Sequence, residues 1–197
     1  DKLIVEATLL SIAPILILNK CDSADAHVVE IFERDYAAHF PTLRVSALTK
    51  AGLDGFFTIL QGKISCFAGQ SAVGKSSLIN ALVPELSLAT GGLSQKTPRG
   101  RHTKRHAELW PMFHGAIMDT PGFSLYEPET LEQEALDQCY PEFTGAVGHC
   151  RFPGCMHISE PDCAIKQMIA SGGMSPGRYE RYKLLAKEFE TRRKHRY

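Results

Sequence analysis

Apolar residues follow two patterns in the first 120 residues of the chain. Short continuous apolar runs, as at 15–18 and 64–68, are typical of parallel strands buried on both faces. Leu53, Phe56 and Leu60 recur at the spacing of an amphipathic helix. The patterns predict strands at 15–18, 43–45, 64–68 and 115–118, and helices at 2–11, 25–38, 51–61 and 76–82. This alternation indicates an α/β fold with a doubly wound, mostly parallel sheet.

The pattern changes after residue 128. An acidic helix is predicted at 129–137 and a basic helix at 176–196. Between them, 140–163 is rich in Pro, Gly, Cys and His and has too few aliphatic residues for a core of its own. Residues 87–106 have no period and are expected to form a long loop. We therefore expect two domains, 1–128 and 129–197.

A phosphate-binding motif lies between a predicted strand and a predicted helix. It has the form G-x-x-x-x-G-K-S and consists of Gly69, Gln70, Ser71, Ala72, Val73, Gly74, Lys75 and Ser76. The backbone N–H groups of such a loop surround phosphates, the lysine reaches the β- and γ-phosphates, and the serine hydroxyl ligates Mg²⁺. Asp119 and Gly122 form a D-x-x-G motif, in which the carboxylate holds Mg²⁺ and the glycine N–H binds the γ-phosphate.

A guanine-reading motif precedes the phosphate loop. Asn19, Lys20, Cys21 and Asp22 form N-K-x-D at the end of an apolar run. The Asp22 carboxylate can accept two hydrogen bonds from guanine, and adenine does not offer this pair of donors. Asn19 can contact the base or brace the loop. The aliphatic stem of Lys20 can cover the plane of the base. Ser46 and Ala47 resemble the motif whose backbone N–H meets guanine O6. Because the base reader comes first, the order is that of a circularly permuted GTPase.

The switch threonine and the group that positions water are expected in the basic loop. Thr103 is the candidate for ligating Mg²⁺ when the γ-phosphate is present, and Thr97 competes with it. Phe123 stands where other GTPases carry a water-orienting glutamine, so we expect slow intrinsic hydrolysis. His102 is the internal candidate to position water; contact with phosphate, RNA or solvent is the alternative.

Six cysteines are present, and three of them are clustered with a histidine. Cys150, Cys155, His157 and Cys163 supply a complete tetrahedral donor set for a structural Zn²⁺. Unpaired buried cysteines with a surface histidine are the alternative, and His149 competes with His157 as the fourth ligand. A phosphate loop implies access to cytosolic nucleotide, where disulfides are rare, so we expect a cytoplasmic metal protein.

Together these motifs resemble the ribosome small-subunit-dependent GTPase A family (RsgA, also called YjeQ or EngC). The resemblance runs through 19–22, 46–47, the loop to Ser77, 99–103, 119–123, the Cys₃His cluster and the Arg178-Tyr179-x2-Tyr182 stretch that opens the last helix. It implies a circularly permuted GTPase domain at 1–128 and a zinc-knuckle and basic-helix domain at 129–197. It also implies binding of GTP or GDP with Mg²⁺, one zinc ion, and GTP hydrolysis stimulated by the small ribosomal subunit in its late maturation, through rRNA.

Two departures from the family pattern affect these expectations. Ala72 replaces a usual glycine, which alanine tolerates only at a negative φ. Family members also carry an N-terminal OB-fold domain and a central strand ahead of the position of Asp1, so we expect the chain to be a fragment of a longer protein.

The distribution of charge along the chain bears on which partners it can bind. The chain has 22 basic and 22 acidic residues, yet the basic ones crowd 96–106 and 178–196. The last helix is expected to offer its basic residues to RNA phosphates and Tyr179 and Tyr182 to stacking, although a solvated charged face is the usual interpretation of such a run. The basic residues are Arg178, Arg181, Lys183, Lys187, Arg192, Arg193, Lys194 and Arg196. No apolar run reaches the ~18 residues of a membrane span. We expect a monomer without a membrane partner. A protein-effector signalling GTPase and a nucleic-acid-binding module without turnover are the alternative functions.

Overall fold

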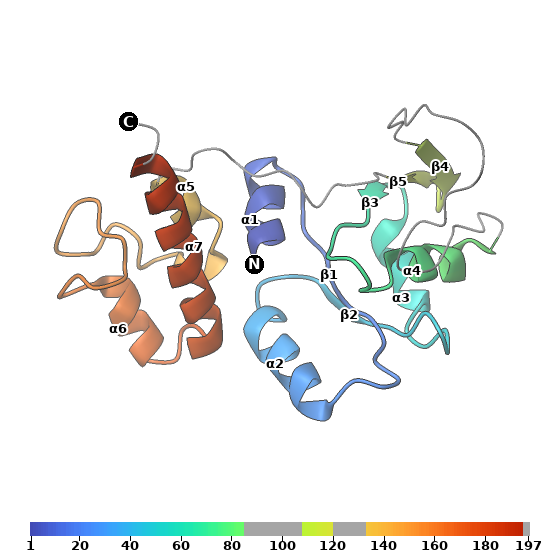
Figure 1. Ribbon diagram of the computed structural model, residues 1–197, viewed down its shortest axis with the longest axis horizontal. Helices are drawn as coiled ribbons and strands as arrows, with labels where there is room; N and C mark the ends of the chain where they lie inside the picture. Colours follow the sequence, from blue (N-terminus) through green and yellow to red (C-terminus); the bar gives the residue numbers. More distant parts are fainter. Residues whose placement is uncertain (85–107, 120–132, 195–197) are drawn as a thin grey trace. The chain divides into compact units, whose positions relative to one another are not determined.

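The computed structural model describes residues 1–84, 108–119 and 133–194 (Figure 1). The helices are α1 (Lys2–Leu9), α2 (Ala26–Tyr36), α3 (Asp54–Leu60), α4 (Lys75–Leu82), α5 (Gln133–Gln138), α6 (Ala164–Ala170) and α7 (Pro176–Lys194), with a 3₁₀ turn η3 at Pro141–Phe143. The strands are β1 (Leu16–Leu18), β2 (Thr42–Arg44), β3 (Ile64–Cys66), β4 (Glu108–Met112) and β5 (Gly115–Asp119). The predicted α/β class is confirmed.

The described chain divides into two compact units. One contains residues 17–29, 42–84 and 108–119; the other contains 1–16, 30–41 and 133–194. The first unit holds all the described nucleotide motifs, and the second holds the Cys₃His cluster. The functional division at residues 128 and 129 stays a prediction. No helix of the described residues is long and apolar enough to cross a lipid bilayer.

The described strands form two sheets rather than one. β1 pairs with β2, and the other sheet has the order β3-β5-β4. β3 and β5 are parallel, with Ile64 opposite Ala116 and Cys66 opposite Met118. The residues of β1 are only half-buried, so the expectation of burial on both faces was wrong for this strand. Among the described strands it has a single neighbour, β2.

The sequence pattern missed the hairpin of β4 and β5. Its two turn residues, Phe113 and His114, both have positive φ, 51° and 56°. Two-residue hairpin turns need such angles and usually use Asn-Gly or Gly-Gly, so the Phe-His pair gave no turn signal. β4 also contains Pro111, which is tolerated because β4 is the edge strand of its sheet.

Each unit has its own core. In the nucleotide-motif unit, α3, α4 and β5 pack together with the residues that follow β2 and precede α3. The buried side chains are Val45, Leu53, Phe56, Leu60, Leu78 and Ile117. In the other unit the core is rich in aromatic and sulfur-containing side chains, including Tyr140, Phe143, Cys155, Cys163, Tyr182 and Phe189. The segment 140–163 therefore joins a core that α1, α5, α6 and α7 complete (Figure 1). The two cores share no residue.

Candidate functional site

The phosphate loop links β3 to α4. Gly74 precedes the helix with φ 93°, a left-handed conformation that favours glycine. A Cβ at this position would lie 2.5 Å from Nδ2 of Asn19, so a side chain would also clash with the guanine motif. Lys75 donates hydrogen bonds from Nζ to the carbonyl oxygens of Gly69 at 2.5 Å and Gln70 at 2.9 Å. Its ammonium group therefore lies across the loop that would surround phosphates.

Asn19 joins three predicted motifs. Its Nδ2 donates to the Val73 carbonyl in the phosphate loop at 3.0 Å. Its Oδ1 accepts from the N–H groups of Lys20 at 2.8 Å and Ala47 at 3.2 Å. Of the two roles left open by the sequence, the geometry assigns bracing of the loop. The contact of the Ser46–Ala47 motif with guanine stays a prediction.

The rest of the guanine motif is held by the same loop. Lys20 donates from Nζ to the Ala72 carbonyl at 3.0 Å, so its stem lies between the two motifs. The Cys21 N–H donates to the Val45 carbonyl at 3.0 Å and fixes the loop to the strand end. Asp22, next along, is exposed. Ser46 is fully buried, and its hydroxyl accepts from the Thr49 N–H at 3.0 Å.

Only some of the predicted magnesium ligands lie among the described residues. Ser76 and Ser77 lie in the first turn of α4, and Asp119 ends β5. Because β3 and β5 are parallel neighbours, Asp119 and the phosphate loop follow strand ends at the same edge of the sheet. His102, Thr103, Thr97 and Gly122 lie outside the described residues. Their predicted roles stay predictions.

Ala72 has φ 66°, in the left-handed region. The condition under which alanine suits this position, a negative φ, is not met. We expect Ala72→Gly to raise the free energy of unfolding by about 1 kcal/mol, because relief of the strain exceeds the added entropy of the unfolded chain. Chemical denaturation measures this change.

Ala81, in α4, is the matched control for that substitution. Ala81→Gly makes the same chemical change at a helical position, and we expect it to lower stability by about 0.5–1 kcal/mol. Destabilisation by both variants would contradict the assigned strain at Ala72.

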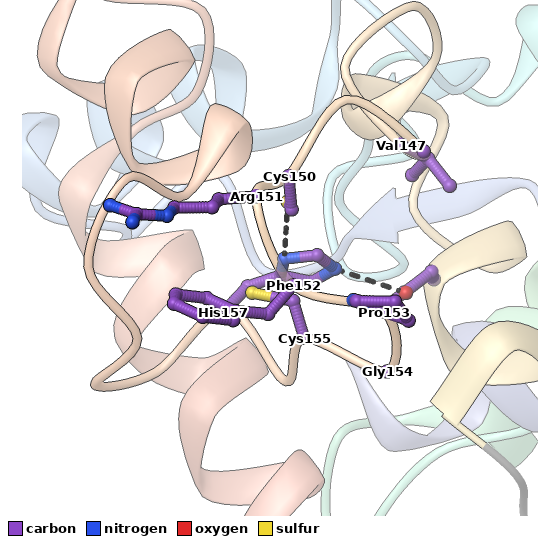
Figure 2. A pocket seen from close by; sticks show the side chains of 10 residues that line it. Val147, Cys150, Arg151, Phe152, Pro153, Gly154, Cys155 and His157 are labelled. Carbon is purple, nitrogen blue, oxygen red and sulfur yellow. Dashed lines mark hydrogen bonds and ion pairs between the residues drawn. The ribbon is translucent and has the colours of Figure 1, made fainter.

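The Cys₃His cluster is assembled as the spacing predicted. The four candidate ligand atoms of Cys150, Cys155, His157 and Cys163 lie within 4.8 Å of one another. Nδ1 of His157 is 3.5 Å from Sγ of Cys150 and 3.4 Å from Sγ of Cys163, and these two sulfurs are 3.8 Å apart. Figure 2 shows the side chains of Cys150, Cys155 and His157 converging. His149, the competing ligand, is exposed and is not in the cluster.

The distances among Cys150, His157 and Cys163 fit a tetrahedral zinc ion. With Zn–S near 2.3 Å and Zn–N near 2.0–2.1 Å, adjacent ligands are separated by about 3.8 Å for two sulfurs and about 3.6 Å for nitrogen and sulfur. Burial raises the pKa of the Cys155 thiol to about 12, with the neighbouring Cys163 adding to the effect. A bound cation is what would hold such a thiol as a thiolate. The donor set therefore suits a structural ion with no open position.

Two residues support the cluster in roles that the sequence did not predict: Asp137 was not singled out, and Tyr182 was assigned to RNA contact instead. Asp137, from α5, has Oδ2 at 3.1 Å from Nε2 of His157. Tyr182, from α7, donates from its hydroxyl to Oδ1 of Asp137 at 2.9 Å. Burial lowers the pKa of His157, but the hydrogen bonds to Asp137 and Cys163 outweigh it and raise the pKa to about 9. Asp137 belongs to no motif, so no spacing signal indicated it.

A pocket of about 360 Å³ adjoins the cluster. The loop from Val147 to Gly154 forms most of its lining, and Cys155, His157 and Asp137 complete it (Figure 2). The Arg151 guanidinium lies 5.5 Å from the ring centre of Phe152 and pairs with Asp162 at 2.7 Å. Both side chains of the Arg151–Phe152 pair are exposed.

The interpretation of Arg178 and Tyr182 as RNA-facing residues was wrong. Arg178 is 1% exposed, forms ion pairs with Glu142 and Asp1, and lies 4.8 Å from the ring centre of Tyr140. Tyr182 is fully buried. Tyr179 is half-buried, and its hydroxyl donates to the His157 carbonyl at 2.5 Å. These side chains hold α7 in its own unit. The exposed basic positions of α7 are Lys187, Arg193 and Lys194.

A phosphate loop braced by a guanine motif that precedes it in the chain defines the circularly permuted GTPase fold. The family model described as RsgA GTPase matches residues 1–129. A protein of Geobacillus sp. (strain WCH70), named small ribosomal subunit biogenesis GTPase RsgA, is 41% identical over 197 residues, covering 98% of this chain and 67% of that protein. The chain belongs to the RsgA GTPase family.

Two solved structures have the same fold. The crystal structure of YjeQ from Thermotoga maritima matches with a TM-score of 0.80 and 32% identity, covering 95% of this chain and 64% of that one. The structure of YloQ, described as a circularly permuted GTPase, matches with a TM-score of 0.76 and 30% identity, covering 97% and 62%. The chain thus spans somewhat less than two thirds of each solved relative.

Proposed function

We propose that this chain is the GTP-hydrolysing part of a protein that acts in maturation of the small ribosomal subunit. The observation that carries the proposal is the pair of hydrogen bonds that Asn19 makes, donating to the Val73 carbonyl and accepting from the Ala47 N–H, which unites the base reader with the phosphate loop. The names of the relatives, small ribosomal subunit biogenesis GTPases, support the ribosomal role. The proposed location is the cytoplasm, where GTP and ribosomes are found, and the proposed state is a monomer.

The proposed reaction is attack of water on the γ-phosphate of GTP, giving GDP and phosphate. Asp22 binds the guanine edge, Lys20 covers the base, and the loop 69–77 binds the phosphates, with Lys75 on the β- and γ-phosphates. Ser76, Thr103 and Asp119 are the proposed ligands of Mg²⁺, which neutralises charge on the phosphates when bound. Gly122 is proposed to bind the γ-phosphate.

The proposed metal of the second site is one structural zinc ion held by Cys150, Cys155, His157 and Cys163. It would fix the segment 147–163 as part of a surface for rRNA. The proposed contacts with RNA phosphates are three exposed basic residues: Lys187 and Arg193 in α7, and Arg151 next to Cys150. Binding through such side chains should weaken steeply with salt.

One assay tests the function. We expect GTP hydrolysis by the chain to be slow alone and faster with purified small ribosomal subunits, with ATP not hydrolysed in either case. Turnover independent of subunits would favour a signalling GTPase. Bound nucleotide without phosphate release, even with subunits, would favour a binding module.

The same assay tests His102. We expect His102→Ala to return subunit-stimulated turnover toward the unstimulated rate, because the water is no longer positioned, while GTP affinity stays within a few-fold of the original. His39→Ala is the control, since His39 is exposed and belongs neither to a predicted site nor to the proposed rRNA surface. Unchanged stimulation in His102→Ala would exclude the catalytic role.

A further inference from the structure

One carboxylate from outside the metal motif lies against the candidate ligands. Asp137, near the end of α5, is buried, and its Oδ2 is 3.1 Å from Nε2 of His157. The opposite ring nitrogen, Nδ1, is the atom that faces Cys150 and Cys163. The imidazole is therefore held between the carboxylate on one side and the thiol cluster on the other, as the dashed lines in Figure 2 indicate.

The carboxylate is itself fixed. Oδ1 of Asp137 accepts a hydrogen bond from the Tyr182 hydroxyl at 2.9 Å, and that hydroxyl also lies 3.2 Å from the Met156 carbonyl oxygen. Tyr182, from α7, is fully buried in the core of its unit. Its ring lies edge-on to the ring of Phe143, with 4.9 Å between the ring centroids. Both side chains are buried, so their hydrogen bonds orient the histidine.

We propose that Asp137 is the positioning residue of the zinc centre and that Tyr182 locks it in place. A carboxylate can only accept, so it keeps the imidazole proton on Nε2 and leaves the lone pair of Nδ1 directed at the metal. It also makes the imidazole a more basic ligand. The metal is thereby joined through His157, Asp137 and Tyr182 to α5 and α7. The inference rests on the proposed zinc site and adds to it a residue that does not touch the ion.

The test is the zinc affinity of the full chain, measured by competition with a chromophoric chelator. We expect Asp137→Asn to weaken zinc binding about 10–100-fold, the range found when such a supporting partner is removed. With Co²⁺ in place of zinc, the thiolate-to-metal absorption should persist, because all three cysteines remain. Tyr182→Phe keeps the packed ring and should give a smaller loss in the same direction.

Asp162→Asn is the matched control. Like Asp137→Asn, it replaces a carboxylate by an amide and removes one negative charge near the cluster, here from the residue next to Cys163. The Asp162 carboxylate, however, is exposed and pairs with Arg151. We expect its zinc affinity to equal that of the unaltered chain. An equal loss in Asp162→Asn and Asp137→Asn would mean that charge alone matters, and would overturn the positioning role.

The remaining outcomes are also decisive. If the unaltered chain does not bind zinc, the proposed metal site fails. If it binds zinc and Asp137→Asn binds equally well, the metal site stands and the inference fails. If Asp137→Asn does not fold even in excess zinc, Tyr182→Phe decides, and an affinity equal to that of the unaltered chain overturns the inference.

Discussion

Removal of the proposed zinc ion is expected to unfold the unit that contains the Cys₃His cluster. Between η3 and α6 the chain has no regular helix or strand, and Cys155 and Cys163 are themselves members of the core. Zinc binding to Cys and His sites supplies about 10–16 kcal/mol, as much as the whole stability of a typical domain. Hydrogen exchange with and without chelator should report loss of protection at Ile165 and Tyr182. Leu78 and Ile117, in the core of the other unit, should keep their protection.

Two cysteine variants separate the metal from ordinary packing. Cys163→Ser removes a ligand, so it should unfold the same unit without any chelator. Cys139→Ser changes an equally buried cysteine of the same core whose Sγ donates to the Ala135 carbonyl at 3.2 Å, and a serine hydroxyl can donate there too. We expect this control to stay folded and to remain sensitive to chelator. A chain that keeps its protection after complete removal of metal would show that packing alone suffices.

The nucleotide motifs could be predicted because each is a short local pattern. Gly69 to Ser76 carries its chemistry in its spacing, and Asn19 to Asp22 does the same. The link between them could not be predicted, since the hydrogen bond from Asn19 to Val73 joins residues far apart in the chain. The choice between bracing the loop and contacting the base therefore needed the structure. The left-handed φ of Ala72 likewise depends on how the loop is anchored.

The basic helix illustrates the opposite case. A run of Arg and Lys in α7 indicated a solvated or RNA-facing surface, but the acidic partners of its first turns lie elsewhere in the sequence. Glu142 pairs with Arg178, and Asp35 pairs with Arg181 at 2.7 Å. Charge counting along one helix could not find these partners. The role of Asp137 could not be predicted for the same reason, because it follows from a contact with His157, 20 residues away in the chain, and not from the sequence around Asp137.

Replacement of Asp22 by Asn is expected to weaken GTP binding by about 10²–10⁴-fold, because two charge-assisted hydrogen bonds to guanine, about 1.5–3 kcal/mol each, are lost or reversed. An amide offers one donor and one acceptor, which suits xanthine, whose C2 carries a carbonyl group in place of the guanine amine. The variant should therefore gain affinity for xanthosine triphosphate as it loses affinity for GTP. Calorimetry with the two nucleotides measures both changes.

Asp25→Asn is the control for that substitution, because it removes the same charge from the same loop. Oδ1 of Asp25 accepts from the His27 N–H at 2.7 Å at the start of α2, and asparagine serves equally well at a helix N-terminus. Its nucleotide affinity should match that of the unaltered chain. If Asp22→Asn also binds GTP normally, or gains nothing for xanthosine triphosphate, then Asp22 does not read the base and the orientation of guanine against Asn19 and Lys20 must be different.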